Sequence, residues 1–198
     1  MDYVKIYKKK VVFNGDVLNL ESYNIKNISD IKRLHKHFKL KELYLEKNQI
    51  PDLQGLTPLI NLEKLHLEAN QIPKIEGLTP LSHLKELELR GNQITKIEGL
   101  EALSNLKDLD LSYNQIREID GLNSLINLER LNLSYNNITE VKGLENLKNL
   151  KQLYLSNNDI HFIKGLENLP KLNHLELNEN PISNKEILSK FKEITVII

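Results

Sequence analysis

Residues 84–105 read LKELELRGNQITKIEGLEALSN, and this unit of 22 residues recurs along most of the chain. Leucine holds its first place seven times in succession, at Leu40, Leu62, Leu84, Leu106, Leu128, Leu150 and Leu172. Leucines follow in the fourth and sixth places of each unit. A fixed period of this length and spacing predicts a solenoid rather than a globular enzyme core. In a solenoid, function lies on the one open face.

Each unit begins with a short strand that ends at an asparagine. From Glu86 to Arg90 polar and apolar residues alternate, which turns Leu87 and Leu89 to one face of a strand. An asparagine side chain carries both donors and an acceptor, so we expect it to satisfy backbone groups of its own turn and of the next repeat. These asparagines are Asn48, Asn70, Asn92, Asn114, Asn136, Asn158 and Asn180.

The second part of each unit returns the chain to the next strand. Gly99 and its equivalents predict a positive φ or a close backbone approach. Leu100 and Leu103, three residues apart, predict a turn too short for a full helix. The expected fold is therefore an α/β solenoid, a right-handed horseshoe. Its concave side would be a parallel β-sheet and its convex side 3₁₀ and short helical turns.

The ends depart from the unit and are predicted to be caps, because the terminal repeats of a solenoid must hide their core. Residues 1–39 are expected to form an N-terminal cap with a degenerate first repeat. A β-hairpin is predicted at Asn14-Gly15 and a short amphipathic helix over residues 29–38. Residues 40–183 are the repeats. Residues 184–198 are expected to form a C-terminal cap, with a helix over 185–191 and a last strand at 194–198. All three parts form one continuous domain.

Composition narrows the functional classes. Lys+Arg and Asp+Glu both total 27, so the net charge of zero gives no reason to expect nucleic acid as a partner. The absence of cysteine excludes disulfides and thiolate metal sites. The N-terminus lacks the apolar stretch of a signal peptide, and no run of 18 apolar residues predicts a membrane span. We therefore expect a monomer in the cytoplasm, or alternatively in the nucleus.

The repeat resembles the 22-residue subclass of leucine-rich-repeat proteins. That subclass includes the regulatory subunit of protein phosphatase 1, axonemal dynein light chain and the bacterial internalins. The stretch from Asn180 to Ser183 is similar to the C-terminal cap of the intracellular members. The resemblance implies a non-catalytic scaffold that binds a protein, such as a regulatory subunit of an enzyme like a phosphatase. The alternative it implies is a secreted or cell-surface adhesin of the internalin type.

The outward strand positions predict where a partner would bind. They hold nine acidic and four basic residues, an excess of five negative charges, with Glu86, Glu88, Asp108 and Asp110 on adjacent strands. Clustered like charges are mildly destabilising, and interface centres favour tyrosine and arginine. We therefore expect a basic segment of a partner protein to bind here, although solvated sheet residues are the simpler interpretation. The predicted contact residues are Tyr44, His66, Glu86, Glu88, Arg90, Asp108, Asp110, Tyr113, Arg130, Asn132, Tyr135, Tyr154 and Glu176.

Motifs for chemistry are missing from the sequence. It contains no glycine-rich nucleotide loop and no H-E-x-x-H. The four central carboxylates could crowd their oxygens around a cation, but calcium sites usually add a loop and backbone carbonyls. We therefore expect no cofactor, no metal and no enzyme activity. Phe162 replaces a polar residue of the other repeats, and we expect it to fold over an edge of the core rather than to contact a partner.

Overall fold

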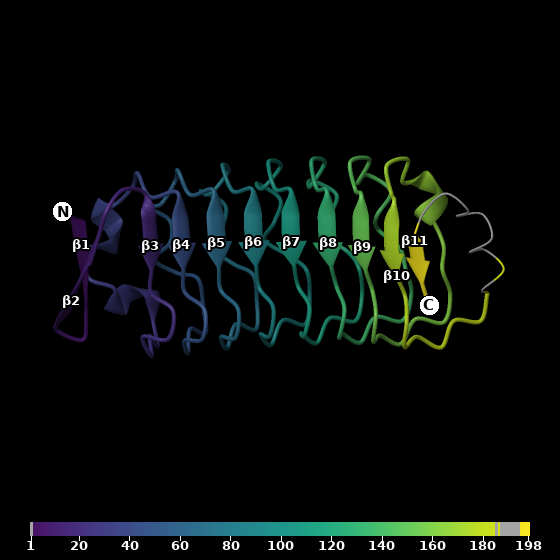
Figure 1. Cartoon of the computed structure of the whole chain (residues 1–198), viewed down its shortest axis with the longest axis horizontal. Helices are drawn as coiled ribbons and strands as arrows, with labels where there is room; N and C mark the ends of the chain where they lie inside the picture. Colours follow the sequence, from purple (N-terminus) through teal and green to yellow (C-terminus); the bar gives the residue numbers. More distant parts are fainter. Residues whose placement is uncertain (1, 185, 187–194) are drawn as a thin grey trace.

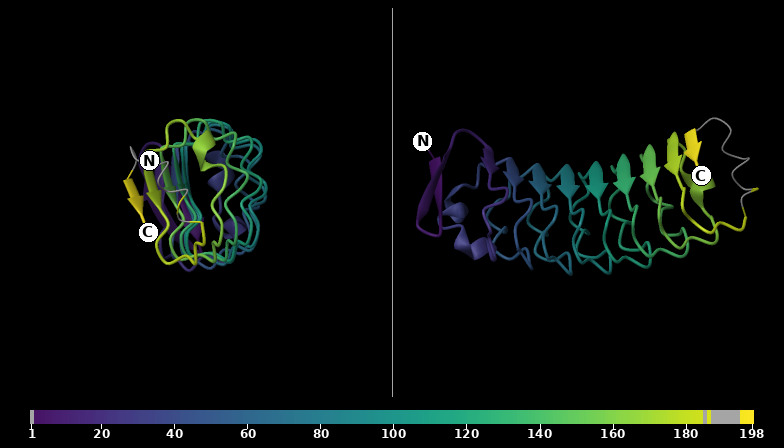
Figure 2. Two further views of the ribbon diagram at one scale, coloured as in Figure 1. Left: turned by 90° about the vertical axis from the view of Figure 1, so that its right-hand side faces the viewer. Right: turned by 60° about the horizontal axis from the view of Figure 1, so that its bottom comes forward.

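The protein is an elongated, gently curved solenoid in the computed structural model, which describes residues 2–184, 186 and 195–198 (Figures 1 and 2). Its described residues form a nine-stranded sheet in the order β11-β10-β9-β8-β7-β6-β5-β4-β3. All its neighbouring strands pair in parallel, as predicted. The strands are β3 (Val17–Asn19), β4 (Glu42–Tyr44), β5 (Lys64–His66), β6 (Glu86–Glu88), β7 (Asp108–Asp110), β8 (Arg130–Asn132), β9 (Gln152–Tyr154), β10 (His174–Glu176) and β11 (Thr195–Ile197).

The repeat pattern maps directly onto burial. In each strand from β4 to β10 the central leucine is buried and points into the core. The strands pair in register, so that Leu43 lies beside Leu65 and Leu65 beside Leu87. The leucines and isoleucines of successive repeats therefore share one continuous core. No repeat can bury its apolar side alone, so this core stabilises the repeats only as a stack.

Buried asparagines form the ladder that the sequence predicts. The side chain of Asn92 donates to the carbonyl of Leu89 in its own repeat and to that of Leu67 in the preceding repeat, both at 3.0 Å. Its oxygen accepts the backbone N–H of Ile72 at 3.0 Å. Each such side chain thus pairs backbone groups that would otherwise be buried without partners, an arrangement whose loss costs about 1–3 kcal/mol per group.

In each repeat the segment that leads back to the next strand is closely packed at its glycine and irregular elsewhere. Gly99 has a φ of +72°, and a Cβ added there would lie 2.0 Å from the carbonyl oxygen of Ile75. The positive φ favours glycine, as predicted, and the close approach of the Ile75 carbonyl leaves no room for a Cβ. The convex side consists of turns closed by i→i+3 backbone bonds, such as that from Leu81 N–H to Leu78 oxygen at 2.9 Å. One such turn forms the 3₁₀ helix η3 (Leu166–Asn168).

The N-terminal cap covers the first core layer, but its construction differs from the prediction. The hairpin consists of β1 (Asp2–Ile6) and β2 (Lys9–Phe13), one strand earlier than predicted. Asn14-Gly15 instead leads into β3, because Leu18 belongs to the stacked core and β3 pairs with β4. The predicted helix over residues 29–38 is also wrong: two 3₁₀ helices, η1 (Ile28–Asp30) and η2 (Leu34–Lys36), occupy that segment.

The C-terminal end confirms one prediction. Strand β11 extends the sheet beyond β10, in register with His174, Leu175 and Glu176. The helix predicted over residues 185–191 lies outside the described residues, apart from residue 186. Within the described ranges, no helix is both long and apolar enough to cross a membrane.

Candidate binding site on the concave face

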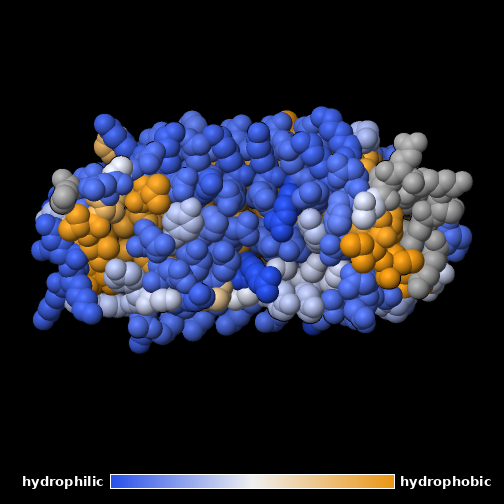
Figure 3. Space-filling view, viewed as in Figure 1, coloured by the Kyte–Doolittle hydropathy of each residue, from blue (hydrophilic) through white to orange (hydrophobic). Residues whose placement is uncertain are grey.

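The predicted contact residues lie on one face, in rows that run across the strands. The register places Glu88 beside Asp110, Asp110 beside Asn132, and Asn132 beside Tyr154. The right-hand view in Figure 2 shows the strands along the inner curve of the solenoid. On the sheet side, hydrophilic residues cover the middle of the molecule and hydrophobic residues gather near the two ends (Figure 3). The concave face is therefore a polar surface, and its residues can be compared strand by strand.

Acidic residues gather on and just after strands β4 to β7. The sequence predicts four of them as neighbours, Glu86, Glu88, Asp108 and Asp110, and the register of β6 and β7 places these side by side. We call the whole group the acidic patch, which consists of Glu42, Glu46, Glu68, Glu86, Glu88, Asp108 and Asp110. Their charge is partly balanced within the face. Lys64 lies 3.8 Å from Glu42 and 3.5 Å from Glu86, and Arg130 lies 2.8 Å from Asp108. Some carboxylates of the patch are thus paired with cations, so its negative charge is uneven.

Asp110 differs from the other members because it is buried. Its carboxylate accepts the backbone N–H of Ser112 and the side-chain amide of Asn132, both at 2.8 Å. Arg130 lies 3.6 Å from the same carboxylate. Removing it would leave the buried N–H of Ser112 and the half-buried amide of Asn132 without this acceptor, so Asp110 supports the face structurally as well as electrostatically.

Protonation reduces the charge of the patch. Burial, with the charges of Asp110 and Asp108, raises the pKa of Glu88 to about 8. Glu88 is therefore mostly neutral at pH 7, and the free face carries less than its formal negative charge. Burial also raises the pKa of Asp108, although Arg130 opposes this shift. A cation placed over these groups would lower both pKa values and release a proton.

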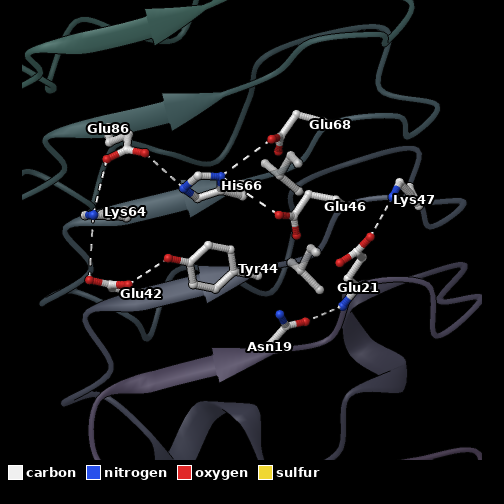
Figure 4. A network of polar contacts seen from close by, with 12 residues as sticks. Asn19, Glu21, Glu42, Tyr44, Glu46, Lys47, Lys64, His66, Glu68 and Glu86 are labelled. Atoms are coloured by element: carbon white, nitrogen blue, oxygen red, sulfur yellow. Dashed lines mark hydrogen bonds and ion pairs between the residues drawn. The ribbon is translucent and has the colours of Figure 1, made fainter.

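His66 and Tyr44 occupy the N-terminal end of the face (Figure 4). Their rings stack with centroids 4.6 Å apart, and the Tyr44 hydroxyl donates to Glu42 at 2.7 Å. That hydrogen bond, with burial, raises the pKa of Tyr44 to about 12. Burial lowers the pKa of His66, but Glu68, Glu86 and Glu46 together raise it above its usual value. Both predicted contact residues are therefore fixed by neighbouring carboxylates.

A second region lies towards the C-terminal repeats, a shallow depression of about 250 Å³. We call it the tyrosine–serine pocket and define it by Ser112, Tyr113, Ser134, Tyr135, Tyr154 and Ser156. The rings of Tyr113 and Tyr135 stack with centroids 4.1 Å apart, and Arg90 covers Tyr113 at 4.3 Å. Of the other predicted contacts, Asn132 and Glu176 also line the depression. It offers aromatic rings and hydroxyl groups to a partner.

Two features of this pocket are absent from the sequence pattern. Tyr113 and Tyr135 have φ angles of 55° and 58°, in the left-handed region. Every repeat places a residue there, immediately before the asparagine, and glycine fills the position only at Gly91. The Ser112 hydroxyl is buried without a hydrogen-bond partner. Aligning the repeats would have marked the position but not its backbone conformation.

Phe162 is a correction. Its side chain is 58% exposed, so it does not fold over the core as expected. Phe162 pairs with Glu140 in an isolated β-bridge that is separate from the concave strands.

Comparisons with known proteins agree with this architecture. The family model described as "Leucine-rich repeat" matches residues 65–197, and that described as "Leucine Rich repeats (2 copies)" matches residues 39–80. No curated protein matches the chain in sequence. Among solved structures, internalin C2 from Listeria monocytogenes is 31% identical with a TM-score of 0.83, covering 91% of this chain and 80% of that one.

Two further structures are similar. An internalin, inlF, from Listeria monocytogenes is 28% identical with a TM-score of 0.79, covering 88% of this chain and 51% of that one. A leucine-rich-repeat protein from Leptospira interrogans is 30% identical with a TM-score of 0.81, covering 92% of this chain and 48% of that one. The chain thus spans about half the length of these two proteins.

Proposed function

Since the chain belongs to the leucine-rich-repeat family, we propose that it is a non-catalytic scaffold that binds a partner protein on its concave face. The finer proposal is that the partner presents a basic segment to the acidic patch and that the tyrosine–serine pocket anchors a neighbouring part of it. The chain would act as a monomer, without cofactor, nucleic acid or membrane. Regulation of an enzyme such as a phosphatase is a further proposal that rests on the resemblance of the repeats.

The observation that carries the proposal is the position of the two regions on one rigid sheet. Strand β7 contributes Asp108 and Asp110 to the acidic patch, and the same repeat contributes Ser112 and Tyr113 to the pocket. Charges steer association and select partners by sign, while buried aromatic contacts slow dissociation. Adjacent placement lets one extended segment use both.

The test is partner capture followed by quantitative binding with matched variants. Glu42→Gln, Glu86→Gln and Asp108→Asn together neutralise three half-buried carboxylates of the acidic patch without touching the buried Asp110. The control neutralises three exposed glutamates outside the concave strands, Glu76→Gln, Glu118→Gln and Glu140→Gln. We expect the first variant to bind the captured protein about 10-fold to 100-fold more weakly, with a flatter salt dependence. Equal affinities for the two variants would reject the proposal.

The internalin similarity favours a second candidate, a cell-surface adhesin domain. It shares the protein-binding role but places the chain outside the cell, whereas the cytoplasmic location predicted from the sequence stays a prediction. Surface labelling of intact cells of the source organism separates the two. Labelling of the chain before lysis would support the adhesin, and labelling only after lysis would support the intracellular scaffold.

A further inference from the structure

His66 lies among three carboxylates at the N-terminal end of the concave face (Figure 4). Its Nδ1 atom is 3.5 Å from Glu68 Oε1 and 3.9 Å from Glu46 Oε1. Its Nε2 atom is 3.1 Å from Glu86 Oε1. One ligand atom each from Glu46, His66 and Glu68 lies within 4.8 Å of the others. The two imidazole nitrogens therefore face different carboxylates, two on one side and one on the other.

We propose that Glu46, His66 and Glu68 form a binding site for a divalent transition-metal ion, with zinc as the ion that suits the donors best. Imidazole nitrogen and carboxylate oxygen are ordinary zinc ligands at about 2.0–2.2 Å, so neighbouring ligands around a tetrahedral ion lie about 3.3 Å apart. The separation of Nδ1 from Glu68 is already close to that value. Glu46 lies one strand away, with Oε1 3.9 Å from Nδ1, so its side chain would have to move closer to complete the set.

Glu86 is close enough to His66 to become the supporting contact that such a site needs. His66 Nε2 is buried and makes no hydrogen bond in this structure, and Glu86 Oε1 lies 3.1 Å from it. A metal-binding histidine commonly directs its second ring nitrogen at a carboxylate, which fixes the tautomer and strengthens the ligand. With the proton on Nε2, facing Glu86, the lone pair of Nδ1 points to the side of Glu46 and Glu68. The Tyr44 ring, stacked on His66, restrains the imidazole plane. Glu86 is thus a positioning residue, whereas the other three residues are ligands.

Two buried carboxylate oxygens of this cluster lack hydrogen-bond partners. The Oε2 atoms of both Glu46 and Glu68 are buried and have no hydrogen-bond partner. Burial of an unpaired carboxylate oxygen is costly. Three carboxylates around one imidazole also leave an excess of negative charge even when His66 is protonated. A divalent ion bound here would offset that negative charge and bond to the carboxylate oxygens.

The face offers a matched comparison at its other end. His174 on β10 contacts one carboxylate, Glu176, at 2.9 Å, and it belongs to no such cluster among the described residues. His174 therefore tests whether one histidine beside one carboxylate is sufficient to bind the metal ion. Three protein ligands leave one position of a tetrahedral ion open, to water or to a side chain of a bound protein. This site thus goes beyond the proposed scaffold role.

The experiment is a titration of the full chain with cobalt(II), followed by competition with zinc. We expect one cobalt ion per chain, a visible absorption band typical of tetrahedral nitrogen and oxygen ligands, and loss of the band when zinc is added. His66→Gln should abolish the band at cobalt concentrations that saturate the unmodified chain. Glu86→Gln should weaken binding about 10-fold to 100-fold, the scale of a supporting contact.

His174→Gln is the control and should leave the cobalt isotherm unchanged. Circular dichroism of each variant verifies that it is folded, and a zinc-dependent rise in Tm that the His66 variant lacks gives an independent readout. The proposal is overturned if millimolar cobalt produces no band, or if the His66 and His174 variants bind cobalt equally well.

Discussion

The acidic patch and the tyrosine–serine pocket lie next to each other on the concave face, yet they work by different physics. The patch places half-buried carboxylates beside one another, with Glu86 opposite Asp108 and Glu88 opposite Asp110. The pocket instead offers hydroxyls and stacked rings, mostly from residues just beyond the strand ends. The first is long-range and sensitive to salt, and the second acts only at contact. A constant scaffold can therefore hold two kinds of recognition side by side.

The boundary between the two regions should show the largest effect on stability. Asp110 accepts the backbone N–H of Ser112, and Asn132 accepts that of Ser134 in the next repeat, but only Asp110 also lies beside Arg130. We expect Asp110→Ala to lower the free energy of unfolding by about 3 kcal/mol. Asp110→Asn and Asn132→Ala should each cost about 1 kcal/mol. Urea denaturation followed by circular dichroism measures all three, and equal losses would show that the ion pair contributes nothing.

Binding should separate the two regions by their salt dependence. Tyr135→Ala removes one ring of the stacked pair and should weaken binding of the captured partner about tenfold, through faster dissociation. The slope of affinity against salt should not change, in contrast to the triple variant of the acidic patch. Surface plasmon resonance at several salt concentrations measures both quantities. A changed salt slope in Tyr135→Ala would mean that the regions do not act separately.

The patch should also make stability depend on pH, whereas the pocket should not. Because Glu88 has a pKa of about 8 when folded and 4.5 as its ordinary value, the folded chain binds more protons between these values. The contribution of Glu88 to the free energy of unfolding is therefore complete below pH 4.5 and is lost as the pH rises through 8. As the pH rises through this window, we expect the free energy of unfolding of Glu88→Gln to rise by about 1–2 kcal/mol relative to that of the unmodified chain. This figure allows for screening of the half-exposed carboxylate by solvent. Thermal unfolding at a series of pH values tests this, and parallel curves for the two chains would contradict it.

The smallest effect concerns the left-handed position that precedes each asparagine. Ala69 has a φ of 52°, so Ala69→Gly should stabilise the chain by about 0.5 kcal/mol. Tyr135→Gly relieves the same backbone strain but loses ring stacking worth about 0.5–1.5 kcal/mol. It should therefore bring no gain. Equal stabilisation by both glycines, measured as Tm, would show that the tyrosine pair is strained without compensation.

The sequence predicts most of the scaffold, because the same residue types recur at the same few positions of every repeat. The strands, the asparagine ladder, the restriction at Gly99 and the shared face of Glu88, Asp110 and Tyr154 all follow from spacing alone. The metal site did not follow, because it depends on distances between side chains of adjacent strands. Glu46 and Glu68 occupy the same place in successive repeats, but spacing does not show that His66 lies between them.

The cap was mispredicted for a related reason. Asn14-Gly15 is a local turn signal, whereas the observed turn uses Tyr7 and Lys8, both with positive φ. The hydroxyl of Tyr7 donates to the carbonyl of Asn24 at 2.9 Å, a contact that offsets part of the strain. Stacking of β3 on β4 decided which residues could form the hairpin. Tertiary packing thus overrode a local preference.

Carboxyl footprinting with and without the captured partner tests the central claim most directly. A water-soluble carbodiimide and an amine label exposed carboxylates, and mass spectrometry quantifies the label at each residue. We predict that the partner lowers labelling of Glu42, Glu86 and Asp108 several-fold and leaves Glu76, Glu118 and Glu140 unchanged. Protection of the second set with full labelling of the first would contradict recognition on the concave face.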